Sequence, residues 1–119
     1  MQRATPELRS YDCADHDPID AWVPDDDVVY YYLNLSVGIR GRRGSDHYAV
    51  LICTPRGLSE AKSLGWQIGP AAPIVLPSYT WKQALEAVEL RLSHCEAASV
   101  LAAQENLGKL FRWEFEGYR

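Results

Sequence analysis

Residues 28–39 show the most regular pattern in the chain, a two-residue alternation of apolar and mixed positions. One face of this segment is wholly apolar and consists of Val29, Tyr31, Leu33, Leu35, Val37 and Ile39. The opposite face consists of Val28, Tyr30, Tyr32, Asn34 and Ser36. Such alternation is typical of a strand in an antiparallel sheet that packs one side on the core.

The residues that follow predict that this strand is the first half of a hairpin. Residues 40–46 are rich in glycine and charge, which favours a turn. Residues 47–54 then have the composition of a return strand. Pro55 keeps the residue before it extended, and we expect the strand to end there.

A helix is predicted to begin after Thr80, because Thr80 and Gln83 have the spacing of a capping box. Apolar positions then recur at helical spacing, at Trp81, Leu85, Val88, Leu92 and Cys95. A helix running on to Gly108 would be about 40 Å long at about 1.5 Å per residue, too long for a chain of this size. We therefore expect a break near residues 94–99 and a second, shorter helix that has Gly108 just beyond its end.

The remaining segments complete an α+β domain. Residues 7–12 predict a short edge strand, 73–77 another short strand, and the alternation over 111–116 a half-buried strand. Residues 56–73 are ambiguous, with one helical turn expected over 59–64. We predict a single domain over residues 1–119, with a mostly antiparallel sheet of about four to five strands and one or two helices packed on it.

Composition agrees with one small globular domain in a reducing compartment. The chain has 119 residues, of which 47% are hydrophobic and 24% charged, ordinary proportions for a folded protein. No apolar run has the length of a signal peptide core or a membrane span. Three cysteines are an odd number and form no disulfide framework. We therefore expect free thiols, a cytoplasmic location and no membrane partner.

Charge is distributed unevenly along the chain. Residues 12–27 hold seven of the eight aspartates and no lysine or arginine. Pro18 and Pro24 interrupt the segment, so it is predicted to be a loop. Outside it, twelve basic residues face nine acidic ones. A nucleic acid is an unsuitable partner for the acidic segment, because phosphate binding requires lysine and arginine, whereas a basic protein is suitable.

Metal and nucleophile motifs in the sequence are incomplete. As an EF-hand, a loop starting at Asp15 would have Ile19 at the fifth position and Asp20 where the turn requires glycine. Cys13 and His16 have the spacing of two zinc ligands, but no second pair matches them. No serine stands in a nucleophile elbow and no glycine-rich phosphate loop is present. The sequence therefore predicts no catalytic residue, metal or cofactor.

Three interpretations of the acidic segment remain open. It is a solvated loop that maintains solubility, a set of carboxylates used by a small metal-dependent enzyme or accessory protein, or a binding face for a basic protein. Trp22 lies among the aspartates, and Tyr30 and Tyr32 project from the adjoining strand. Aromatic residues bordered by carboxylates suit a surface that receives lysine and arginine. Helices covering that face would instead make the two tyrosines part of the core.

Several motifs in order resemble the immunity protein 8 family, the small cytoplasmic antidotes of bacterial polymorphic-toxin and contact-dependent growth inhibition systems. The motifs lie within residues 24–58 and 79–118: Pro24-Asp25-Asp26, Val37-Gly38, Cys53-Thr54-Pro55, Leu58, Trp81, and Phe111, Trp113, Glu114, Phe115, Glu116 and Tyr118. Gly57 departs from the pattern, in which a tryptophan or another large residue is expected. The resemblance transfers no catalytic residue and implies binding and neutralisation of a cognate toxin.

The charge of the acidic segment and the family resemblance together favour one toxin-facing surface. Many such toxins are nucleases, whose clefts must be basic to hold phosphates. We predict that the toxin-facing residues are Asp15, Asp17, Asp20, Trp22, Asp25, Asp26 and Asp27. The alternatives are the metal-dependent enzyme already named and a structural subunit of an unrelated complex.

Overall fold

The computed structural model describes residues 3–113. In chain order the elements are β1 (Pro6–Asp12), a short 3-10 helix η1 (Ile19–Ala21), β2 (Tyr30–Ile39), β3 (Asp46–Cys53), α1 (Pro55–Ser63), β4 (Ile74–Val75), α2 (Trp81–Ser93), α3 (Val100–Leu110) and β5 (Arg112–Trp113). Residues 114–116 of the predicted C-terminal strand lie outside the described residues.

One five-stranded sheet organises residues 3–113. Its order is β1-β2-β3-β4, and β5 also pairs with β3. All pairings are antiparallel except that of β3 with β4, which is parallel because α1 forms the crossover between them. The predicted α+β fold with a mostly antiparallel sheet is confirmed. β1 carries a bulge at Arg9, since its register with β2 shifts between Leu8 and Ser10.

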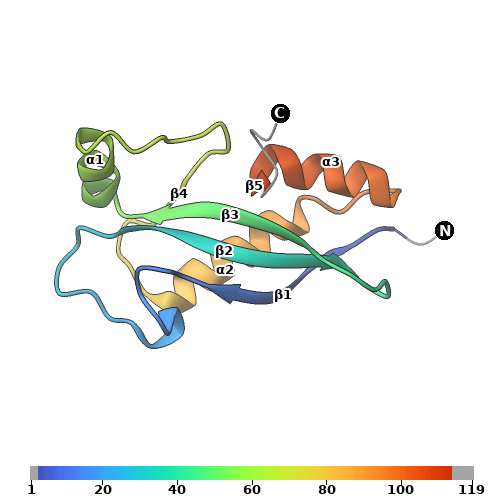
Figure 1. The fold of residues 1–119 in the computed structure, drawn as a ribbon, viewed down its shortest axis with the longest axis horizontal. Coiled ribbons are helices and arrows are strands. Elements are labelled where there is room, and N and C mark those ends of the chain that lie inside the picture. The colour runs from blue at the N-terminus through green and yellow to red at the C-terminus, as the bar shows by residue number, and fades with distance from the viewer. Residues whose placement is uncertain (1–2, 114–119) are drawn as a thin grey trace.

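The predicted core face of β2 is confirmed, because every second side chain from Val29 to Ile39 is buried. α2 lies across this face of the sheet and is seen behind the strands in Figure 1. Its buried residues Ala84, Val88 and Leu92 belong to the same apolar cluster as the β2 side chains. Leu107 joins that cluster from α3. The core therefore lies between the sheet and the two C-terminal helices.

The helix caps decide where α2 and α3 begin. The Thr80 hydroxyl accepts a hydrogen bond from the Gln83 amide, as the capping-box spacing predicted. α2 ends at Ser93, and Ser99 caps α3 by accepting from the Ala102 amide, so the predicted break near 94–99 is confirmed. The prediction that Gly108 follows the second helix is wrong. α3 continues to Leu110, since Gly108 keeps a helical backbone.

The third helix, α1, is longer than the single turn expected over 59–64. It begins at Pro55, directly after β3, and extends over nine residues. Pro55 ends the strand, as predicted, but it also occupies the first position of a helix, where its fixed φ angle suits the helical backbone. α1 therefore starts about one turn before the predicted residues 59–64.

Gly57 brings α1 against the backbone of the residue preceding β2. A Cβ atom at this position would lie 1.8 Å from the carbonyl oxygen of Val29. No side chain fits there unless the helix moves. Position 57, where the sequence departs from the family pattern, therefore requires glycine in this structure.

Replacing Gly57 by alanine is expected to lower the free energy of unfolding by about 2 kcal/mol or more, because the methyl group would overlap the Val29 carbonyl. Gly108→Ala is the matched control. Its methyl group would meet nothing within 4 Å, and alanine should stabilise α3 by about 0.5–1 kcal/mol. Urea unfolding of the two variants measures both effects. Equal stability of Gly57→Ala and the unchanged chain would contradict this packing.

Candidate functional site

The acidic segment connects β1 to β2 at one end of the sheet, next to α1 (Figure 1). Apart from η1 it has no regular structure, which confirms the predicted loop. Two side chains anchor it, since Cys13 and Ile19 are each 2% exposed and belong to the main core cluster. The segment is therefore an ordered loop that holds its polar residues outside a fixed apolar base.

All six aspartates predicted to face a partner are exposed. Three of them have local partners: Asp20 accepts from the Tyr11 hydroxyl, Asp26 from the Val28 amide, and Asp27 pairs with Arg56 at 2.9 Å. The other three, Asp15, Asp17 and Asp25, have no partner within residues 3–113. These three carboxylates are the ones most available to an incoming cation.

Trp22, the aromatic residue predicted for this site, is half-buried and packs inward. Its ring stacks on His16 with the centroids 3.8 Å apart, makes an edge-to-face contact with Tyr31 and lies tilted against Tyr79. Tyr31 and Tyr79 share a hydrogen bond of 2.9 Å between their hydroxyls. Burial, followed by this hydrogen bond, raises the pKa of Tyr31 well above its usual value. Trp22 therefore packs the acidic segment against the core. The exposed part of its ring also contributes to the surface of that segment.

A second aromatic group, missed by the sequence reasoning, lies beside the first. Trp66 lies in the loop after α1. Its ring stacks on Tyr32 with the centroids 5.8 Å apart and meets Tyr30 edge to face with the centroids 5.1 Å apart. The Tyr32 hydroxyl also donates to the Gln67 carbonyl at 2.7 Å. The two tyrosines are therefore partly covered by this loop. The sequence offered one signal for this aromatic group. A tryptophan lies in a glycine-rich segment, and Tyr30 and Tyr32 project from the strand without an assigned partner.

The two aromatic groups border one hollow of about 320 Å³. Its lining consists of Asp15, His16, Trp22, Val28, Tyr30 and Trp66. Apolar ring surface with a carboxylate at the edge suits a long cationic side chain, whose stem is apolar and whose head is charged. We name this hollow and the neighbouring exposed aspartates the acidic-aromatic end. Of the predicted residues, the structure brings Asp15 and Trp22 into the hollow.

The hydroxyl group of Thr54 connects this end to the rest of the fold. Thr54 is 1% exposed and caps α1 by accepting from the Gly57 amide at 3.1 Å. The same oxygen accepts from the Val29 amide at 3.1 Å and donates to the carbonyl of Asp27. One side chain thereby joins the end of the acidic segment, the start of β2 and the start of α1.

The family of this chain follows from comparison with known protein families. The family described as Immunity protein 8 matches residues 6–118, nearly the whole chain. The chain belongs to the Immunity protein 8 family. No curated protein and no solved structure matches it significantly.

The motifs that resemble this immunity protein family lie at joints between elements. Gly38 is near the end of β2, where a Cβ would lie 2.2 Å from the guanidinium carbon of Arg9. Residues 53–55 join β3 to α1, and Trp81 opens α2. Phe111, at the end of α3, is fully buried. The terminal motif residues Glu114, Phe115, Glu116 and Tyr118 lie outside the described residues. The motif residues at positions 38, 53–55, 81 and 111 therefore have structural roles.

Groups suited to metal binding or nucleophilic catalysis are dispersed in this immunity protein. Within residues 3–113, no three histidine, cysteine or carboxylate side chains are close enough together to hold a metal ion. All three cysteines are free and buried. Burial raises the pKa values of Cys53 and Cys95 to about 11, so both thiols are protonated at neutral pH. Over the same residues, no helix is long and apolar enough to cross a membrane.

Replacing Thr54 by valine is expected to lower the free energy of unfolding by about 2–4 kcal/mol, because it removes a helix cap and leaves the Val29 amide buried without an acceptor. Thr54→Ser, which keeps the hydroxyl, should recover most of this loss. Thr80→Val removes an exposed cap that makes one hydrogen bond and should cost about 1 kcal/mol. Chemical denaturation compares the three. Similar losses for Thr54→Val and Thr80→Val would rule out the joining role of Thr54.

Proposed function

We propose that this immunity protein binds a cognate toxin domain in the cytoplasm of the producing cell and neutralises it by covering a basic surface, without catalysing a reaction. The observation that carries the proposal is the acidic-aromatic end. There, a hollow lined by Trp22, Tyr30 and Trp66 opens beside carboxylates that have no partner in the described part of the chain. A nuclease domain, whose cleft must be basic, is a suitable toxin.

The two kinds of group in this surface have different roles in the proposed complex. The exposed carboxylates attract a basic partner at long range and raise the association rate. The aromatic side chains supply apolar area that is removed from water on binding and that slows dissociation. Because Cys13, Ile19 and Trp22 already anchor the segment, little conformational entropy is lost when the complex forms. Buried free thiols agree with a reducing compartment.

The charge contribution is tested with the triple variant Asp15→Asn, Asp17→Asn and Asp25→Asn, which leaves the local hydrogen bonds of the segment intact. Titration calorimetry against the C-terminal domain encoded by the gene immediately upstream should show binding at least about tenfold weaker. The salt dependence should also be flatter, since fewer charges are paired on binding.

The matched control removes three negative charges from the helices, with Glu86→Gln, Glu89→Gln and Glu105→Gln, and should bind as the unchanged chain does. Equal weakening of both triple variants would show that net charge acts without a specific surface. Full affinity in the aspartate variant would move the interface elsewhere. Absence of binding by the unchanged chain would overturn the proposed partner.

The aromatic contribution predicts a different kinetic signature. Trp66→Ala should raise the dissociation rate constant by about 30-fold or more, because a half-buried tryptophan at the centre of an interface contributes about 2 kcal/mol or more. The association rate constant should change little, since no charge is lost. Surface plasmon resonance measures both constants. Trp113→Ala, which replaces a tryptophan outside the hollow, is the control.

A further inference from the structure

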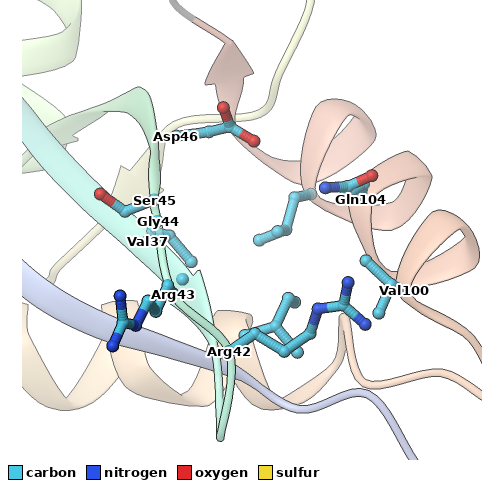
Figure 2. Close-up of a pocket in the computed structure, with 11 residues that line it drawn as sticks. Val37, Arg42, Arg43, Gly44, Ser45, Asp46, Val100 and Gln104 are labelled. Atoms are coloured by element: carbon cyan, nitrogen blue, oxygen red, sulfur yellow. The ribbon is translucent and has the colours of Figure 1, made fainter.

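A second hollow, also of about 320 Å³, lies at the opposite end of the sheet from the acidic-aromatic end. Figure 2 shows it between the β2–β3 turn and α3. Val37, Ile39 and Leu107, which are 3%, 9% and 2% exposed, provide apolar lining. The side of the hollow formed by the turn carries Arg42 and Arg43. We name this feature the turn hollow.

The turn that forms one wall is held in place by Arg9. The Arg9 guanidinium donates to the carbonyls of Ile39, Arg42 and Gly44 at 2.9, 2.6 and 2.6 Å. Gly38 makes this possible, since any side chain there would occupy the position of the guanidinium. The Ser36 and Ser45 hydroxyls add a hydrogen bond of 2.7 Å across the base of the turn. The wall of the turn hollow is therefore preorganised.

The arginines of this wall have no acidic partner, in contrast to most others. Arg3, Arg9, Arg40 and Arg56 each lie within 4.0 Å of a carboxylate. No carboxylate of residues 3–113 pairs with Arg42 or Arg43. In Figure 2 the Arg42 side chain is directed toward α3, whereas that of Arg43 is directed away from it. Arg42 therefore places an uncompensated guanidinium beside apolar surface, which is suited to binding an anion.

The position of Arg42 near the start of α3 also favours an anion site. In Figure 2 its side chain extends across the mouth of the hollow toward Val100, the first residue of α3. The start of a helix carries partial positive charge, so a cation placed there is unfavourable unless an anion accompanies it. An anion between Arg42 and the first turn of α3 would be attracted by both.

The carboxylate of Asp46 favours a singly charged anion over a doubly charged one. It lines the same hollow on the side away from Arg42 (Figure 2). A doubly charged phosphate would be repelled by this carboxylate, whereas a single carboxylate at the Arg42 side is farther from it and carries half the charge. The apolar lining in addition favours a ligand with an aliphatic stem. Glutamate and aspartate side chains have this combination.

We propose that the turn hollow is a docking site for an acidic side chain of a protein partner. The stem of the acidic side chain lies over Val37, Ile39 and Leu107, and its carboxylate lies between Arg42 and the start of α3. The site is at the far end of the sheet from the acidic-aromatic end. A negative result for this site would therefore leave the proposed toxin contact unaffected.

The test uses the full chain and a capped peptide, acetyl-Glu-Leu-Glu-Leu-Glu-amide, followed through backbone amide shifts by NMR. Saturable shifts are expected in residues 40–46 and 100–104. Arg42→Glu should weaken binding by about tenfold or more, because attraction becomes repulsion. The Arg42 side chain makes no hydrogen bond or ion pair with the described residues, so this variant should fold. Arg56→Glu, at the other end of the sheet, is the control and should bind the peptide normally.

Two further titrations separate the alternatives. The same peptide with glutamine in place of glutamate should bind much more weakly, and equal binding would overturn the carboxylate assignment. Inorganic phosphate should produce smaller shifts than the peptide at equal concentration. Shifts with phosphate but not with the peptide would overturn a protein side chain as the ligand. No shifts in residues 40–46 and 100–104, or full peptide binding by Arg42→Glu, would overturn the site itself.

Discussion

The conformation of the acidic-aromatic end depends on the hydrogen bonds made by the buried hydroxyl of Thr54. A strand, a helix and an irregular acidic segment meet at this point. The Val29 and Gly57 amides would be buried without a partner if the hydroxyl were absent, and the partly buried carbonyl of Asp27 would lose its donor. A single hydroxyl can both donate and accept, so it satisfies all three groups at once. Gly57 completes the arrangement, because its lack of a side chain lets the helix approach the strand closely enough for these bonds to form.

This arrangement explains how a densely charged loop can be held in one conformation. Seven aspartates within sixteen residues repel one another, and no lysine or arginine within the segment offsets that repulsion. The segment is ordered because its apolar side chains, Cys13, Ile19 and Trp22, enter or contact the core while the carboxylates stay in water. Stability and charge are thus carried by different residues of the same segment. The exposed carboxylates of the segment can then vary without removing the side chains that anchor it.

Much of the fold could be predicted from local patterns. The alternation over 28–39 predicted the core strand, and the Thr80–Gln83 spacing predicted the start of α2, because both depend on neighbouring residues alone. The aspartates were predicted to be exposed for the same reason. Features that depend on distant residues were missed. Trp66 joins Tyr30 and Tyr32 only after α1 folds back on the sheet, and the role of Arg9 requires the glycine at position 38 on the neighbouring strand.

The bulge at Arg9 has a consequence for how this protein behaves when it is abundant. Among residues 3–113, β1 pairs with β2 alone, so within that range its outer edge offers backbone groups that could template another chain. The extra residue breaks the regular spacing of those groups halfway along the strand. Glu7 and Arg9, on the same strand, are charged and paired, which makes a dry contact there costly. A bulge and paired charges on an edge strand both disfavour the addition of another strand to the sheet.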